Sequence, residues 1–352
     1  MKKVFDIHSH YLFDIPLDKT VEIFKQEFSE IGVCKNAFLS VPYEIRGGNY
    51  EFEELQNIKA LYLKKAFSPN AYAFGALIHP NNVDYSNVNK IRADFLNQAK
   101  TFFNVGYDGI KMLEGYPTLM KYRKLRLDDE VFDDFYAFMQ DSGYPIILHA
   151  GNPESSWNLS NATPEKIFLG RIYDNSYPTK QEITNQVFNV LNKFPKLKLI
   201  LAHFGFLTYN INEAEKFLGD YKNTAFDITP GGENYFNMLK NWDLWHNFIK
   251  KYQNKIYYGT DFYAFPNEDE NEWRTCFTRR PNFVRQFFET DTEHYYINDK
   301  FKGVLLEEDI LEKIYRTGDI KASGKACRLA GLRMPRAKQS GENYTFMLYA
   351  EN

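Results

Sequence analysis

Two stretches of the sequence decide the fold class: Pro145-Ile146-Ile147-Leu148-His149-Ala150-Gly151 and Leu199-Ile200-Leu201-Ala202-His203-Phe204-Gly205. Each is a short apolar run that ends in a histidine, with a glycine two residues later. An uninterrupted apolar run of this length is typical of a parallel strand that is buried on both faces. The histidine then marks the strand end at which barrel enzymes carry their chemistry.

The rest of the chain repeats this pattern, because short apolar runs alternate with amphipathic helical segments. Such alternation requires a parallel sheet, and eight strand–helix units predict an α/β fold, the (β/α)8 or TIM barrel. No glycine-rich phosphate turn follows the first strand, which argues against a doubly wound open sheet. The predicted strands are 3–9, 33–41, 71–78, 107–113, 145–150, 197–203, 223–229 and 255–261. The predicted helices are 17–31, 50–68, 86–103, 128–142, 177–194, 211–220, 233–253 and 307–330.

The chain is longer than a minimal barrel. A barrel core takes about 250 residues, so roughly 100 of the 352 must be insertions or tail. The excursions 151–176 and 262–306 absorb most of them, and both follow the C-terminal end of a strand. We expect one domain over 1–332, with insertions at the C-terminal face of the strands, and a tail over 333–352. The excursion 262–306 is expected to cover the active site.

The composition excludes several classes of protein. With 43 basic and 46 acidic side chains, the net charge of −3 gives no reason to expect nucleic acid or an anionic membrane as partner. Three scattered cysteines form neither a disulfide framework nor a thiolate zinc site and fit a reducing compartment. No apolar run reaches the ~18 residues of a membrane span, and the first residues do not form a signal peptide. We expect a cytoplasmic enzyme whose partner is a small-molecule substrate; a homo-oligomer stays open.

Aromatic residues make up 17% of the chain. They are spread along its whole length rather than interleaved with a basic stripe. This distribution favours an aromatic-rich core over a stacking platform for bases or sugars.

Five of the seven histidines fall at or beside the C-terminal end of a predicted strand: His8, His10, His79, His149 and His203. Buried imidazoles must each find partners, so five at one rim need a common explanation. In Asp6-Ile7-His8-Ser9-His10, a period of two puts the three polar side chains on one inward face. A divalent cation would offset their burial, with His8 and His10 as ligands and Asp6 as support behind them. The alternative is a hydrogen-bonded polar strand end.

Tyr257-Tyr258-Gly259-Thr260-Asp261 ends the eighth predicted strand with a carboxylate. In a closed barrel the first and eighth strands are neighbours. Candidate ligands from strands one, five, six and eight therefore converge on one side of the barrel mouth.

Together these motifs resemble the amidohydrolase superfamily, on the branch that includes aminocarboxymuconate-semialdehyde decarboxylase. The resemblance covers roughly 3–332, including a closing helix at 310–332. It implies one divalent ion, zinc or alternatively manganese, held by His8, His10, His149 and Asp261, with no organic cofactor. It also implies that Asp261 moves the proton of an attacking water and that His203 polarises the substrate.

Six further residues are candidate substrate contacts. Lys111, at the end of strand four, either contacts substrate unmodified, forms a structural ion pair, or is carboxylated to bridge two metals as in some members of the superfamily. His79 either contacts substrate or anchors a loop. Arg46 and Trp157 are candidates by position, as are Arg274 and Arg279 in the second excursion.

Three functions are compatible with these motifs. The first is hydrolysis of a small lactone, ester or amide, favoured by the intact His8-x-His10 because some decarboxylases of the branch carry glutamate at the first position. The second is non-hydrolytic decarboxylation of a small carboxylic acid on the same scaffold. The third is a barrel that binds metal and ligand without turnover, which is disfavoured because no predicted ligand or base is missing.

Overall fold

The structure is a computed structural model. It describes residues 2–12, 16–41, 53–79, 87–161, 167, 171–264 and 270–316. Arg46 and the predicted tail 333–352 lie outside the described residues.

Eight parallel strands form a (β/α)8 barrel, as predicted, and pair in sequence order from β1 to β8. Beyond β8 the chain closes the barrel by hydrogen bonds to β1. The amide of Ile7 donates to the Tyr258 carbonyl at 3.0 Å, and the amide of Asp261 donates to the His8 carbonyl at 2.7 Å. The strands are β1 (Val4–Leu12), β2 (Val33–Leu39), β3 (Ala71–Ala76), β4 (Gly109–Gly115), β5 (Ile146–Ala150), β6 (Leu199–Leu201), β7 (Thr224–Asp227) and β8 (Ile256–Tyr257).

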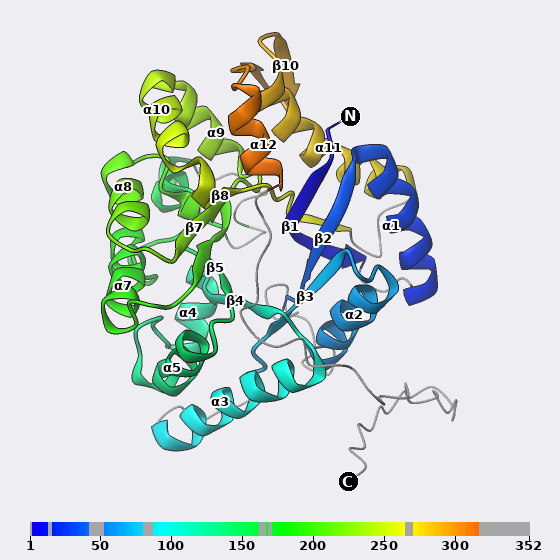
Figure 1. Cartoon of the computed structure of the whole chain (residues 1–352). Coiled ribbons are helices and arrows are strands. Elements are labelled where there is room, and N and C mark those ends of the chain that lie inside the picture. The colour runs from blue at the N-terminus through cyan, green and yellow to red at the C-terminus, as the bar shows by residue number, and fades with distance from the viewer. Residues whose placement is uncertain are drawn as a thin grey trace.

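Helices form a ring around these strands (Figure 1). The main helices are α1 (Leu17–Ile31), α2 (Glu53–Ala66), α3 (Val88–Val105), α5 (Asp133–Ser142), α7 (Lys180–Lys193), α8 (Ile211–Gly219), α10 (Trp242–Tyr252) and α12 (Glu308–Arg316). Additional helices are α4 (Pro117–Arg123) and α9 (Gly232–Leu239), with short 3₁₀ turns at Glu130–Phe132, Glu154–Trp157, Leu159–Asn161, Ala202–Phe206 and Gln253–Lys255. Among the described residues, no helix combines the length and apolar character that crossing a membrane requires.

Two predicted segments differ from the structure. The single helix predicted over 233–253 is two helices, α9 and α10, because Asn241 has a non-helical backbone (φ −149°, ψ 66°). The excursion 262–306 forms regular secondary structure, although the sequence predicted no helix or strand there. It contains β9 (Phe262–Ala264), α11 (Glu270–Glu289) and an antiparallel hairpin of β10 (Glu293–Tyr296) and β11 (Asp299–Lys302), and β9 extends the sheet beside β1.

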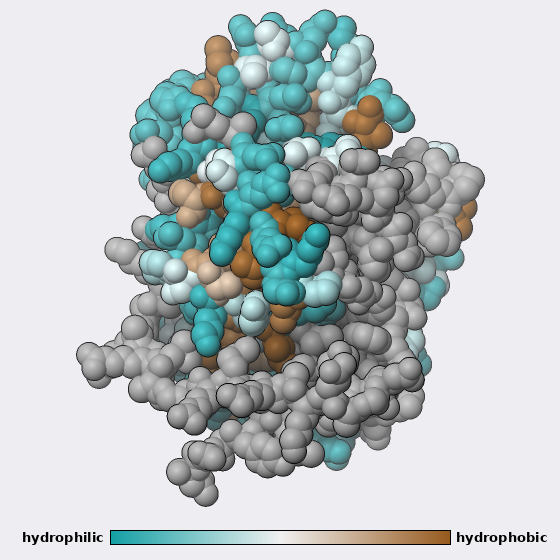
Figure 2. Space-filling view, turned by 90° about the vertical axis from the view of Figure 1, so that its right-hand side faces the viewer, coloured by the Kyte–Doolittle hydropathy of each residue, from teal (hydrophilic) through white to brown (hydrophobic). Residues whose placement is uncertain are grey.

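The core has two layers. One cluster, made only of residues from the strands and their ends, fills the barrel: Phe5, Ile7, Ala37, Leu39, Phe74, Ile147, Ile200, Ala202 and Ala225. The larger cluster packs the outer faces of the strands against the helices and contains many of the aromatic residues. On the face drawn in Figure 2, hydrophilic residues cover most of the described surface. The prediction of an aromatic-rich core is therefore confirmed.

Strand β1 departs from strict alternation. Phe5 and Ile7 point into the barrel core, so a period of two would turn His8 outward. The pairing of β1 with β2 is irregular between Asp6 and Ser9, and beyond this point His8 and His10 enter the barrel mouth. Asp6, His8 and His10 are all buried, but they do not share one face as predicted.

Candidate metal centre

Four of the five histidines predicted at the rim lie together. The ring centroids of His10 and His8 are 5.2 Å apart, those of His8 and His203 are 5.4 Å apart, and those of His203 and His149 are 5.1 Å apart. Residues from β1, β5 and the turn after β6 therefore form one imidazole cluster. His79 lies outside this chain of contacts.

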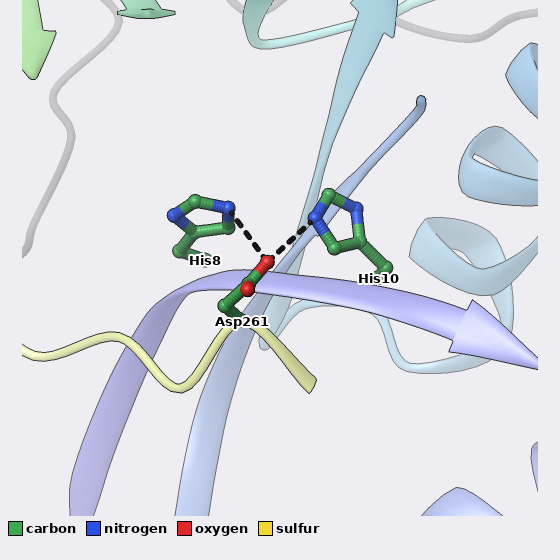
Figure 3. Close-up of side chains that lie close together, drawn as sticks. All are labelled: His8, His10 and Asp261. Carbon is green, nitrogen blue, oxygen red and sulfur yellow. Dashed lines mark hydrogen bonds and ion pairs between the residues drawn. The ribbon is translucent and has the colours of Figure 1, made fainter. Parts of the chain in front are cut away.

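His8, His10 and Asp261 form the candidate metal centre. Among the described residues, these three each bring a donor atom to within 4.8 Å of the others. One carboxylate oxygen, Oδ1 of Asp261, lies 3.1 Å from His10 Nε2 and 3.4 Å from His8 Nε2. Both imidazoles come from β1, and the carboxylate comes from the segment after β8 (Figure 3).

The hydrogen bonds on the far side of each ring determine which nitrogen carries the lone pair. His10 Nδ1 lies 2.7 Å from the Leu39 carbonyl, and His8 Nδ1 lies 2.8 Å from Asp227 Oδ2. A carbonyl and a carboxylate only accept, so both rings carry a proton at Nδ1. Burial, together with the charge of Lys111, lowers the pKa of His8 to about 3, so this ring is neutral at pH 7.

Nε2 of both rings therefore faces the same carboxylate oxygen, and His8 Nε2 also lies 3.1 Å from the Lys111 amine. These donor atoms converge beside the cationic side chains of Lys111 and Arg280. Two imidazole nitrogens and a carboxylate are also a donor set that binds zinc and leaves positions open for other ligands. These residues fit a divalent metal ion.

The geometry of Asp261 is fixed by its neighbours. Its backbone has a positive φ of 52°, which is uncommon for a residue other than glycine and is frequent at functional sites. Burial acts to raise its pKa, but the Arg280 guanidinium and the nearby imidazoles hold the pKa well below its ordinary value. Asp261 is therefore ionised at neutral pH, as a metal ligand must be.

Asp6 supports this loop rather than an imidazole ring. Its carboxylate accepts hydrogen bonds from Thr260 Oγ1 at 2.6 Å, from the Thr260 amide at 3.2 Å and from the His8 amide at 3.0 Å. Burial raises the pKa of Asp6 to about 7. Asp6 thus ties β1 to the segment that carries Asp261.

Gly259 allows this close approach. A Cβ atom there would lie 3.0 Å from the Cβ of His8 and 2.7 Å from Cγ2 of Thr229. The 2.7 Å contact does not occur between real Cβ atoms and their neighbours, and the 3.0 Å contact is tight, so a larger residue would require Thr229 or His8 to shift.

Asp227, at the end of β7, is a residue of the candidate site that the sequence reasoning missed. It lies fully buried and accepts the proton of His8 Nδ1 through Oδ2. Oδ1 accepts from the amides of His203 (2.7 Å) and Thr229 (3.1 Å) and from the Thr229 hydroxyl. A carboxylate that accepts the outer proton of a metal-binding histidine fixes its tautomer and ring orientation. The available signal was its place at the end of the predicted strand 223–229.

The same network orients His203. The Thr229 hydroxyl donates to Asp227, so its oxygen accepts from His203 Nδ1 at 2.9 Å. This leaves the lone pair of neutral His203 on Nε2. Burial lowers the pKa of His203, which keeps the ring neutral. Its backbone is left-handed, as are those of the next three residues (φ between 51° and 59°).

His149 lies in the cluster but outside the three-donor group. Its Nε2 is 3.4 Å from Asn152 Oδ1, and its ring packs against those of Tyr116 and Phe206. Burial, aided by His203, holds its pKa well below the ordinary value. The ring is therefore neutral, and its role as fourth ligand stays a prediction.

Lys111 lies inside the barrel beside His8. It is 1% exposed, and its Nζ is 3.1 Å from His8 Nε2. Burial lowers its pKa to about 8, although Asp227 and Asp261 oppose this shift.

The remaining substrate candidates are engaged elsewhere in the fold. His79 Nε2 lies 2.8 Å from Glu114 Oε1, and both side chains are buried. Trp157 donates its indole N–H to the Pro178 carbonyl at 3.0 Å and packs against Tyr173. These contacts fit the anchoring of loops. Arg46 lies outside the described residues.

Arg280 is a second residue that the sequence reasoning missed. It comes from α11 and donates to the Asp261 carbonyl at 2.8 Å and also to Asp261 Oδ2. The expected candidates from the same excursion differ: Arg279 is exposed, and the side chain of Arg274 lies outside the described residues. The excursion 262–306 therefore reaches the candidate metal centre.

Lys180 is a buried lysine behind the imidazole cluster, at the first residue of α7. Burial lowers its pKa to about 7, although Glu213, Glu154 and Glu233 act to raise it. The folded protein therefore releases this proton near pH 7, whereas the unfolded chain keeps it until about pH 10.4.

We predict a pH dependence of stability from Lys180. Because the unfolded state binds more protons between these two pKa values, the free energy of unfolding should rise with pH. The rise from this group is about 2 kcal/mol between pH 7 and pH 9. Urea unfolding of wild type and Lys180→Met at both pH values measures it, and the variant should lack this rise. Equal pH dependence in the two proteins would contradict the buried titration.

Comparisons with known proteins agree with the motifs. A family model described as amidohydrolase matches residues 105–317, more than half of the chain. Comparison with curated proteins gives no sequence match.

Several solved structures share the fold. One is an uncharacterized TIM-barrel protein from Bordetella bronchiseptica (13% identity, TM-score 0.55, 90% of this chain and 96% of that chain). Another is 2,6-dihydroxybenzoate decarboxylase from Rhizobium (14% identity, TM-score 0.53, 90% of this chain and 97% of that chain). A third is 4-oxalomesaconate hydratase from Rhodopseudomonas palustris (14% identity, TM-score 0.53, 89% of this chain and 93% of that chain). The family match, with the barrel and its histidine motifs, places this chain in the amidohydrolase superfamily of metal-dependent enzymes.

Proposed function

We propose that this chain is a metal-dependent hydrolase that acts on a small lactone, ester or amide. One observation carries the proposal: Nε2 of His8 and Nε2 of His10 both converge on Oδ1 of ionised Asp261, a donor set that suits a divalent ion. Such a site favours a divalent cation and keeps a carboxylate beside it as proton acceptor. The intact His8-x-His10 pair also favours hydrolysis over decarboxylation.

The side chains have distinct roles in this proposal. A divalent ion held there would act as a Lewis acid and lower the pKa of a bound water towards ~7. Asp261 takes the proton of the attacking water and passes it to the leaving group. His203, whose ring lies beside those of His8 and His149, is the residue that polarises the substrate. Lys111 stays unmodified and donates to the substrate.

We predict about one divalent ion per chain, zinc or alternatively manganese, bound by His8, His10, His149 and Asp261. Elemental analysis of protein purified without chelator, combined with the intact mass, measures this. The expected result is a stoichiometry near one and no added mass on Lys111. A stoichiometry near two with a carboxylated Lys111 would contradict the mononuclear site.

Decarboxylation is the second candidate, and two cationic side chains favour it. The Lys111 amine lies beside His8, and the Arg280 guanidinium lies beside Asp261. Cations on both sides of the donor set suit a substrate that carries a carboxylate. Among the similar solved structures, 2,6-dihydroxybenzoate decarboxylase and 5-carboxyvanillate decarboxylase also carry this reaction in their names.

One assay separates the candidates. The metal-free protein is loaded with Zn²⁺ or Mn²⁺ and incubated with a panel of lactones, esters, amides and aromatic carboxylates. Metal-dependent hydrolysis without carbon dioxide release supports the proposal. Carbon dioxide release supports the decarboxylase. Metal binding with no turnover of any compound would favour a binding barrel, the third possibility.

A further inference from the structure

Lys180 occupies a position that is unfavourable for a lysine in two ways. Its side chain is buried, and transferring an ammonium group out of water is costly. It is also the first residue of α7, where the helix dipole disfavours a cation. Thr179 and Glu182 already cap this helix through a capping box. Helix formation alone therefore does not account for a lysine here.

The contacts of Lys180 lead to the imidazole cluster. Its Nζ donates to the Gly205 carbonyl at 3.1 Å and lies 5.2 Å from the centre of the Phe206 ring. Both residues belong to the left-handed turn that begins at His203. The amine also lies close to Gly151, where an added Cβ would be 3.1 Å from Nζ. One buried amine thus contacts the segments that follow β5 and β6.

Phe206 connects Lys180 to the functional side chains. Its ring stacks on His203, with centroids 4.9 Å apart and an angle of 21° between the planes. The same ring packs against His149 at 5.3 Å. His203 is thus held by Thr229 at Nδ1 and by Phe206 on its face. The Thr229 contact is a hydrogen bond to the ring, whereas the Phe206 contact depends on the turn that Lys180 holds.

Four consecutive residues with positive φ, three of them not glycine, are a strained conformation. Such strain persists only where the surroundings over-determine the backbone. The Lys180 amine supplies one such constraint from α7. The side chain of Asn234 supplies another, because it donates to the His203 carbonyl at 2.9 Å.

We propose that Lys180 is a positioning residue that holds the turn 203–206 and thereby the orientation of the His203 imidazole. The proposal rests on the proposed function in one respect, that His203 contacts the substrate. Lys180 itself does not contact the metal ligands His8, His10 and Asp261 through any hydrogen bond in the described chain. Its loss should therefore affect the reaction and not the uptake of metal.

The test compares Lys180→Met with Lys180→Arg and with Lys193→Met. Lys193 is a matched control because it lies at the other end of α7, half exposed and paired with Asp133. Methionine fills the same space without a cation, so Lys180→Met should fold with at least wild-type stability at pH 7. We expect its kcat to fall about 10-fold to 100-fold, because small misplacements of catalytic groups have effects of this size. KM and Zn²⁺ affinity should stay within about twofold of wild type, a change well below the expected fall in kcat.

Arginine keeps a cationic donor and should restore part of the lost kcat, and Lys193→Met should behave as wild type. A purely structural lysine predicts the opposite pattern, with lost stability and unchanged kcat per folded molecule. That pattern would overturn the proposal.

A second measurement needs no substrate. The ring ¹⁵N signals of His203 should shift in Lys180→Met while those of His8 and His10 stay in place, and Lys193→Met should shift none of them. If wild type turns over no compound of the panel, the proposed function fails and this measurement alone decides on Lys180. Unchanged His203 signals would overturn the positioning role.

Discussion

Asp261→Asn is expected to lower turnover at least about 10²-fold and up to about 10⁴-fold, the range of general acid–base catalysis. This corresponds to roughly 3–5 kcal/mol of activation free energy. The variant should keep its fold, because Asp6, Thr260 and Gly259 hold the segment independently of the Asp261 carboxylate. An amide is not basic enough to take the proton, although it can still accept a hydrogen bond. Steady-state rates at full metal occupancy measure the effect.

Metal affinity should fall less than turnover in this variant, because His8, His10 and His149 remain as predicted ligands. The comparison is His203→Asn, which removes the oxyanion group but keeps the base and should lower turnover about 10²-fold to 10³-fold. Near-wild-type turnover of Asp261→Asn with metal bound would show that another group handles the proton.

Most of the barrel could be predicted from the sequence, because strands buried on both faces leave apolar runs that end at a polar rim. The runs around Ile146 and Leu199 correspond to β5 and β6. The second excursion could not be predicted, because α11 is mainly polar and carries Pro281 in its interior. The break between α9 and α10 depends on the backbone of one residue, Asn241. A helical pattern that continues on both sides does not reveal such a break.

The site was predictable where a motif ends a strand, and not where contacts come from distant segments. His8, His10 and Asp261 were predicted and lie together. Arg280 gave no signal, because Arg279 beside it has the same chemistry and only the direction of α11 separates them. Asp227 stood at the end of a predicted strand and could have been found there. The left-handed backbone of His203 is set by tertiary contacts that a sequence does not display.

Asp227→Asn is expected to lower metal affinity about 10²-fold, because it reverses the tautomer of His8. Oδ1 of Asp227 accepts from three donors: the His203 amide, the Thr229 amide and the Thr229 hydroxyl. The oxygen of an asparagine must therefore stay at this position, and its NH₂ group must take the place of Oδ2 and face His8 Nδ1. An NH₂ group only donates, so the proton of the neutral ring moves to Nε2. A protonated Nε2 cannot bind a metal ion.

Mutation of a residue that hydrogen-bonds a metal ligand typically lowers metal affinity roughly 10-fold to 100-fold. We expect the upper end of this range here, because the substitution inactivates one ligand completely. Competition with a chromophoric chelator measures the affinity for Zn²⁺, and ¹⁵N signals of His8 report the tautomer directly. Thr229→Val is the matched control. It removes one donor to Oδ1 but leaves the carboxylate and the His8 tautomer in place, so metal affinity should change only a few-fold. If Asp227→Asn binds Zn²⁺ as tightly as this control, then His8 is not a ligand through Nε2, and the three-donor centre would be wrong.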